Sequence, residues 1–76
     1  MLEELEERLQ EMYKNDIKVT KDEFGFIFIK FGDLFEIPFI YQSKMTLEVN
    51  VRNAKDKIEK NIIRLYRKEI NTNDYY

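Results

Sequence analysis

The chain contains 76 residues, of which 43% are hydrophobic and 37% charged, and its net charge at neutral pH is -2. This composition predicts one folded domain and argues against intrinsic disorder, while the small net charge provides no overall attraction to nucleic acid or membranes. The absence of cysteine and histidine excludes disulfides, zinc–thiolate sites and imidazole catalysis.

The first predicted element is an amphipathic helix over residues 2–13. Apolar residues recur there at helical spacing, and glutamates occupy the opposite side. The segment MLEELEER lacks the basic and apolar regions of a secretory signal, and charged residues interrupt the longest apolar run, so that no membrane span is expected. We therefore expect a cytoplasmic protein with an acidic helix face that comprises Glu3, Glu4, Glu7 and Glu11.

The stretch FGFIFIKFGDLFEIPFIY in the middle of the chain predicts a β-hairpin. Its aromatic and β-branched residues favour strands, and the pair Gly32 and Asp33 is typical of a two-residue hairpin loop. We therefore expect strands over residues 24–31 and 34–41. A bulge, or an end to regular pairing, is expected at Pro38, because proline has no N–H to donate to a neighbouring strand.

The second half of the chain predicts a further strand and a helix. Apolar and polar residues alternate over residues 45–51, which indicates a third strand, while residues 17–20 are either a fourth, edge strand or an extended lead-in. From Asn53, a suitable N-cap, the period becomes helical. The predicted order is α-β-β-β-α, an α+β fold with a three-stranded or four-stranded antiparallel sheet and two helices on one face. Residues 1–70 would form this single domain, and residues 71–76 a flexible tail.

The length of the hairpin loop determines which residues share a face of the sheet, because side chains alternate along each strand. With a two-residue loop, Phe31 opposes Leu34, and one almost wholly apolar face is available to the two helices. The other face then also carries large apolar groups. Such a patch usually marks an interface, so we predict that it binds a protein, either a second copy or a target. The predicted partner-binding residues are Ile27, Ile29, Phe31, Leu34 and Ile40.

The alternative is that the chain itself hides this apolar patch. Residues 1–13 or the C-terminal tail would then fold over the outer face of the sheet, or the two helices would straddle the sheet and cover one face each. In either arrangement the patch belongs to the core, and the argument for a protein partner at this face no longer holds.

Charge is distributed unevenly between the two predicted helices. Residues 1–16 are acidic, whereas residues 52–70 hold seven Lys or Arg against three Asp or Glu. The basic residues form a stripe opposite the apolar one, which suits contacts with phosphates or with an acidic protein. The alternative is a solvated face that partly pairs with the acidic first helix. The basic stripe comprises Lys57, Lys60, Arg64, Arg67 and Lys68.

The predicted element order and the chain length resemble those of double-stranded-RNA-binding domains, in which lysines at the start of the last helix contact phosphates. Arg52, Lys55, Lys57 and Lys60 are similarly placed, although the junction EVNVRNAKDK lacks that family's glycine-rich turn and paired lysines. This resemblance implies nucleic-acid binding as the alternative function. The layout also resembles small phage-encoded inhibitors, including some anti-CRISPR proteins, which implies an acidic face that mimics nucleic acid.

The sequence predicts neither enzymatic activity nor a cofactor or metal. Glu36 and Glu48 are expected near one another on the outer face, but no third group supports them as an acid–base pair. Neither a glycine-rich phosphate loop nor the carboxylate spacing of a calcium site occurs in the sequence. The predicted function is a small non-enzymatic protein-interaction module, of which an inhibitor from a phage or another mobile element is one form.

Overall fold

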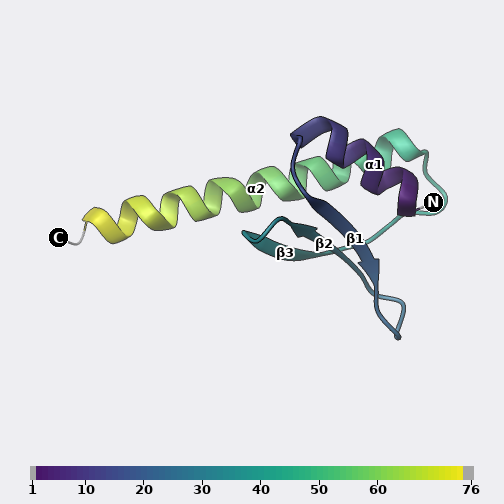
Figure 1. The fold of residues 1–76 in the computed structure, drawn as a ribbon, viewed down its shortest axis with the longest axis horizontal. Helices are drawn as coiled ribbons and strands as arrows, with labels where there is room; N and C mark the ends of the chain where they lie inside the picture. The colour runs from purple at the N-terminus through teal and green to yellow at the C-terminus, as the bar shows by residue number, and fades with distance from the viewer. Residues whose placement is uncertain (1, 75–76) are drawn as a thin grey trace.

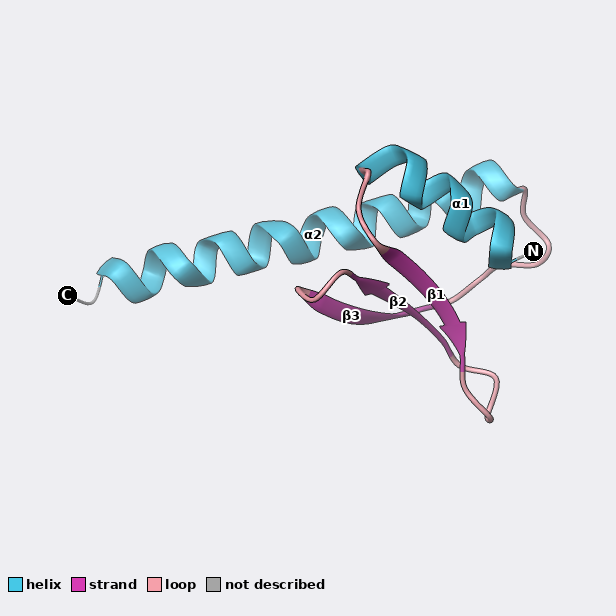
Figure 2. Ribbon diagram, in the orientation of Figure 1, coloured by secondary structure: helices cyan, strands magenta, loops and turns pink. Residues whose placement is uncertain are grey.

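The computed structural model describes residues 2–74 of the chain, with side chains through Lys68 (Figure 1). Its elements are α1 (Leu2–Tyr13), β1 (Ile17–Lys21), β2 (Ile27–Phe31), β3 (Phe35–Phe39) and α2 (Leu47–Asp74). The three strands form an antiparallel sheet in the order β1-β2-β3, and both helices cover the same face of it (Figure 2). This arrangement confirms the predicted α+β fold with the order α-β-β-β-α.

The identity of one strand differs from the prediction. Residues 45–51 do not form a strand, and residues 17–20 belong to β1 instead. Thr46 caps α2, because its Oγ1 accepts a hydrogen bond from the N–H of Val49 at 3.2 Å. Asn53, the predicted N-cap, therefore lies inside the helix. The strand over residues 45–51 was wrongly predicted because residues four positions apart lie on the same face of a strand and also on the same face of a helix.

The loop between β2 and β3 contains three residues rather than the predicted two, because Phe31 pairs with Phe35. Gly32 begins the loop with a φ of 51°, a left-handed conformation that glycine adopts at little cost. Its N–H donates to the carbonyl of Asp16 at 2.7 Å. A shift of one residue in the register moves every side chain of a strand to the opposite face. Both faces of the sheet therefore differ from those predicted.

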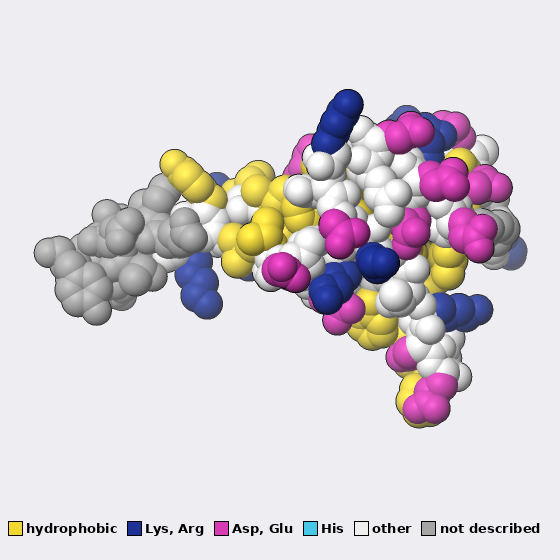
Figure 3. Space-filling view, viewed as in Figure 1, with side chains coloured by type: hydrophobic (Ala, Val, Ile, Leu, Met, Phe, Trp, Pro, Cys, Tyr) yellow, Lys and Arg dark blue, Asp and Glu magenta, His cyan; other side chains and the backbone are white. Residues whose placement is uncertain are grey.

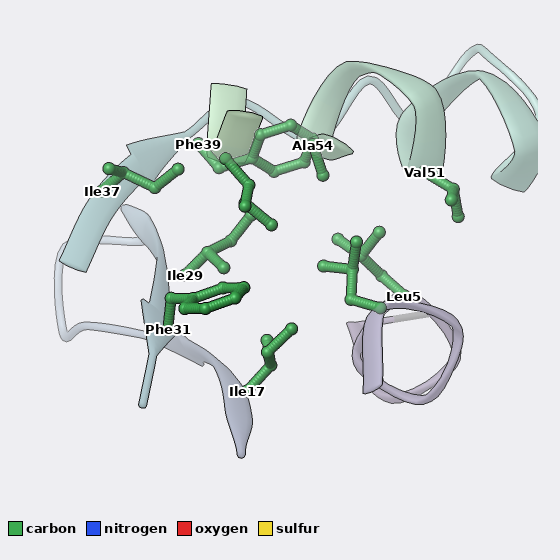
Figure 4. Packing of buried hydrophobic residues seen from close by; sticks show 10 residues of the cluster. Leu5, Ile17, Ile29, Phe31, Ile37, Phe39, Val51 and Ala54 are labelled. Carbon is green, nitrogen blue, oxygen red and sulfur yellow. The ribbon is translucent and has the colours of Figure 1, made fainter. Parts of the chain in front are cut away.

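The hydrophobic core lies between the sheet and the two helices (Figure 4). Alternate residues of all three strands point into it, opposite one face of each helix. At one end of the core, the ring of Phe31 stacks on Phe35 at a centroid distance of 5.2 Å and meets the edge of Tyr13 at 5.3 Å. The buried hydrophobic residues are Leu5, Leu9, Ile17, Ile29, Phe31, Ile37, Phe39, Val51, Ala54 and Ile58.

α2 is much longer than the sheet that it covers. At 1.5 Å per residue its 28 residues extend over roughly 42 Å, whereas a strand of 5 residues spans roughly 17 Å. Among its described side chains the last fully buried one is Ile58, and the rest of the helix projects from the body (Figure 1). The backbone continues beyond the predicted end near residue 70 to Asp74. The sequence also predicts a flexible tail over residues 71–76. The side chains of these residues, and the backbone of residues 75 and 76, lie outside the described part of the chain.

Candidate protein-interaction surface

The predicted partner-binding residues do not form one surface. The three-residue loop turns Ile27, Ile29 and Phe31 toward the helices, and the side chains of Ile29 and Phe31 are 0% and 3% exposed. Leu34 and Ile40 are exposed, but they lie beyond opposite ends of β3. The prediction of an apolar outer sheet face is therefore wrong. The alternative, in which other segments fold over the outer face or the helices straddle the sheet, does not occur either, because Ile27, Ile29 and Phe31 lie on the inner face that both helices cover.

The outer face of the sheet is mostly polar. Phe28 is half-buried there, and the other outward residues of the strands are exposed. A polar outer face is normal for a sheet that is covered by helices on one side. This face therefore offers little apolar area to a partner. Its exposed residues are Lys18, Thr20, Lys30, Glu36 and Pro38.

Side chains of both helices bind some of the backbone groups at the sheet edges. On edge strand β1, the carboxylate of Glu6 accepts the N–H of Val19 at 2.8 Å, and Nε2 of Gln10 donates to the carbonyl of Ile17 at 2.8 Å. On edge strand β3, Pro38 has no N–H, and its carbonyl accepts a hydrogen bond from Nζ of Lys57 at 2.7 Å.

These contacts have two consequences for the edges. Pro38 pairs in register with Phe28, so the predicted bulge is absent, as an edge position allows. Because unpaired edge groups are what an added strand binds, their occupation disfavours association by sheet extension.

The apolar surface of the projecting half of α2 is uncovered. Ile62 and Leu65 follow Ile58 by four and seven residues, so they continue the face that packs on the core. Tyr66 and Ile63 widen this face to one side. We call these four residues the α2 apolar arc; their side chains are between 38% and 65% exposed. Figure 3 shows hydrophobic side chains over this part of the helix, between the body and the atoms drawn in grey.

The end of α1 and the loop between β2 and β3 both lie near the point where α2 leaves the body (Figure 1). Met12 at the end of α1 and Leu34 in the loop between β2 and β3 are both exposed. Tyr13, which follows Met12 in the chain, packs its ring against Phe31, and its hydroxyl is buried without a hydrogen-bond partner. Burial raises the pKa of the Tyr13 phenol, and the charges of Glu59 and Asp56 add to this rise. Tyr13 therefore lies close to Asp56 and Glu59 of α2, of which Glu59 pairs with Lys55.

The predicted acidic face and basic stripe are both exposed. Arg8 of α1 and Glu48 of α2 form an ion pair at 3.2 Å, and the hydrogen bond between them lowers the pKa of the Glu48 carboxyl. A second, between Lys55 and Glu59 at 3.6 Å, lies within α2. Neither of these pairs joins the acidic face to the basic stripe. The exposed residues are Glu3, Glu4, Glu7 and Glu11 on α1, and Lys57, Lys60, Arg64, Arg67 and Lys68 on α2.

A second group of exposed apolar side chains lies at the loop between β1 and β2. The carboxylate of Asp22 accepts the backbone N–H groups of Phe24 and Phe26, both at 2.9 Å, and thereby fixes the loop. Both aromatic side chains are exposed. A shallow hollow beside them is lined by residues that include Ile40 and Tyr41. The loop thus displays two rings on a defined backbone, close to both Asp22 and Glu23.

The two carboxylates considered as an acid–base pair, those of Glu36 and Glu48, lie on different elements of the fold. Glu36 lies on the outer sheet face, whereas Glu48 lies in α2 and pairs with Arg8. In the part of the chain that the structure describes, no three carboxylates assemble as metal ligands would, and no helix combines the length and apolarity needed to cross a lipid bilayer. Comparison with protein-family models, with curated proteins and with solved structures finds no match to this chain.

Proposed function

We propose that this chain is a small, non-enzymatic protein-interaction module that binds a helix of another polypeptide through the projecting half of α2. The observation that carries the proposal is the α2 apolar arc: the face that packs on the core continues beyond Ile58 without cover from any described element. Full burial of one large apolar side chain is worth roughly 1.5–3 kcal/mol. The four side chains of the arc are between 38% and 65% exposed, so each would gain part of this amount when a partner covers it.

The remaining surfaces favour a helix as the bound element. An added strand would need unpaired edge groups, and side chains of α1 and α2 already occupy such groups on both edges of the sheet. The outer sheet face is mostly polar. An exposed apolar helix face is recognised by a second helix, which packs against it at an interaxial distance of roughly 8–10 Å.

A photoreactive amino acid in place of Tyr66 forms a covalent bond with whatever polypeptide covers the α2 apolar arc, and so tests the proposal. Benzoylphenylalanine resembles tyrosine in shape, and the same substitution at Phe28 on the outer sheet face is the matched control. In cells that produce the protein, irradiation should yield a discrete adduct from position 66 and not from position 28. Mass spectrometry of the cross-linked peptides should place the partner's contact in a helix. Equal adducts from both positions, or none from position 66, would contradict the proposal.

Nucleic-acid binding is the second candidate, because the face of α2 opposite the apolar arc exposes Lys60, Arg64 and Arg67. Lys57 of the same stripe already donates to a backbone carbonyl. If phosphates bind this stripe, Lys60→Glu combined with Arg64→Glu should weaken binding to duplex RNA and reduce its salt dependence. Lys18→Glu, on the outer sheet face, is the control. Absence of measurable binding by the unmodified protein at low salt would remove this candidate.

A further inference from the structure

We infer that the outer face of the sheet binds single-stranded nucleic acid, with aromatic rings of β2 stacking on unpaired bases and two lysines beside them contacting phosphates. The inference goes beyond the proposed function and uses none of the residues of the α2 apolar arc. Two observations carry it: the row of exposed rings along β2, and a pair of lysines that face each other across β1 and β2 at the end of this row.

The rings lie in one row along the central strand. The pairing of β1 with β2 continues one position beyond the strand ends, because the N–H of Asp22 donates to the carbonyl of Phe26 at 2.9 Å. Phe26 therefore shares the outer face with Phe28, which follows two residues later, roughly 7 Å along the strand. Phe26 is 65% exposed, and Phe24 at the tip of the same loop is 77% exposed. Accessible rings of this kind form a platform on which bases can stack.

The backbone beneath the rings is held in place by the loop itself. Oδ1 of Asp22 accepts the N–H groups of Phe24 and Phe26, and the carbonyl of Asp22 accepts the N–H of Gly25 at 3.1 Å. A ligand therefore meets rings on an ordered backbone, which lowers the entropic cost of binding. These hydrogen bonds also engage the carboxylate of Asp22, which would otherwise repel a phosphate.

The two lysines occupy the next positions on the same face. Lys30 follows Phe28 by two residues, and its partner in the register is Lys18 of β1; both side chains are exposed. Like charges directly opposite each other on a sheet are destabilising. Neither lysine forms an ion pair with a described residue, and this includes Glu36, which lies beside Lys30 on β3. A bound anion would relieve the repulsion between the two ammonium groups.

An unpaired nucleic-acid strand fits this face better than a duplex or a polypeptide does. It supplies both planar bases for the rings and phosphates for the lysines. The bases of a duplex are already stacked on one another, so they cannot lie on the rings. The core of a protein interface is normally depleted of charge, whereas Lys30 lies directly beside Phe28 here. The phosphates would lie at the lysine end of the row, away from Glu23 in the loop.

A single tryptophan tests the stacking. The chain contains no tryptophan, so Phe26→Trp introduces one reporter and keeps a ring at this position. Addition of a strand of about 8 uridines at low salt should quench its fluorescence, because a base stacks on the ring. Tyr66→Trp, on the projecting half of α2, is the matched control and should not be quenched. No quenching at position 26, or equal quenching of both variants, would overturn the inference.

The same titration with a thymidine strand of equal length distinguishes RNA from DNA as the source of the bases and phosphates. Quenching by either strand supports the inference. A difference between the two strands would show that the 2′-hydroxyl contributes, because this group is present in RNA alone.

Substitutions separate the contribution of the rings from that of the lysines. Phe26→Leu keeps an apolar side chain without a ring and should weaken binding by roughly 5-fold or more, whereas Phe26→Tyr should retain it. Lys18→Gln combined with Lys30→Gln should weaken binding and reduce the salt dependence by a slope of roughly 1.4, given roughly 0.7 for each phosphate contact of a single strand. Lys14→Gln combined with Arg52→Gln removes the same charge elsewhere and should leave the slope unchanged.

The substituted side chains are exposed, so the circular dichroism of every variant should match that of the unmodified protein. Unchanged affinity after Phe26→Leu, or equal losses from the two pairs of charge substitutions, would overturn the inference. Both results would leave the proposed function intact, because they concern no residue of the α2 apolar arc. In the cross-linking experiment, a polypeptide adduct from position 28 would overturn the inference by assigning this face to a protein, whereas an adduct that nuclease removes would support it.

Discussion

The side-chain amide of Asn50 forms two hydrogen bonds with the backbone of Gln42: Oδ1 accepts the Gln42 N–H at 2.8 Å, and Nδ2 donates to the Gln42 carbonyl at 3.0 Å. Nδ2 also donates to the carbonyl of Thr46 at 3.0 Å. Asn50 is the one buried polar residue among the described side chains. It provides the acceptor for the Gln42 N–H and a second donor to the carbonyls of Gln42 and Thr46, and so fixes the connection between β3 and α2.

Replacement of this amide should be costly. We expect Asn50→Ala to lower the free energy of unfolding by about 2–3 kcal/mol, because three hydrogen bonds of about 1 kcal/mol each are lost. Asn61→Ala is the matched control, since the Nδ2 of Asn61 donates to the carbonyl of Lys57 alone, at 3.2 Å. This control should change stability by about 0.5 kcal/mol or less. Urea unfolding followed by circular dichroism measures both, and equal losses would contradict the role assigned to Asn50.

The edge of β1 depends on the carboxylate of Glu6. We expect Glu6→Ala to destabilise the protein by about 1–2 kcal/mol, because the N–H of Val19 loses a charged acceptor at a partly buried edge. Glu7→Ala, at an exposed position of α1, should have little effect. Hydrogen exchange of the Val19 amide provides the local readout and should accelerate in the first variant alone. An unchanged exchange rate would show that this contact does not protect the edge.

The buried hydroxyl of Tyr13 should make the fold sensitive to alkaline pH. The folded chain holds this proton more tightly, because burial first, and then Glu59 and Asp56, raise the phenol pKa. Above the usual tyrosine pKa of roughly 10, the unfolded chain ionises first. The contribution of Tyr13 to stability is therefore fully present below the usual tyrosine pKa, and it is lost as the pH rises through the raised pKa of the folded chain.

Tyr13→Phe tests this pH dependence. The variant should be more stable by about 1 kcal/mol at neutral pH, because a buried hydroxyl without a partner is removed. It should also lose less stability between neutral and strongly alkaline pH. Tyr41→Phe is the control for general effects of tyrosine ionisation. Parallel pH curves for the Tyr13→Phe variant and the unmodified protein would contradict this account.

Titration of the Glu48 carboxyl tests the ion pair between Arg8 and Glu48. The hydrogen bond from Arg8 is the main reason why the pKa of the Glu48 carboxyl lies below its usual value. We expect Arg8→Met to raise this pKa, measured by NMR titration of the Glu48 side chain, and Arg52→Met to leave it unchanged. A lowered folded pKa contributes stability above the usual glutamate pKa that is lost as pH falls. An identical pKa in the Arg8→Met variant would show that the pair is not formed in solution.

The candidate site shows where sequence reasoning succeeded and where it stopped. The sequence placed Ile58, Ile62, Leu65 and Tyr66 on one helical stripe, and the structure places them on one face of α2. The sequence did not show that Ile58 is the last of them to be buried, because periodicity carries no information on how far the sheet extends. The predicted strands of eight residues and the predicted helix from residue 53 to about 70 have similar lengths of roughly 26 Å, so the excess length of α2 appears only in the structure.

The amino-acid sequence alone determined the α+β class with a helix at each end, the central hairpin, the apolar face of each helix and the lack of cysteine and histidine chemistry. These properties depend on residues within one or two turns of each other, so spacing reveals them. Only the tertiary structure decided that Phe31 pairs with Phe35, that residues 45–51 continue into a helix, and that half of α2 has no cover. A single residue in a hairpin loop reverses the faces of a sheet, and strand pairing across the whole fold selects that residue count.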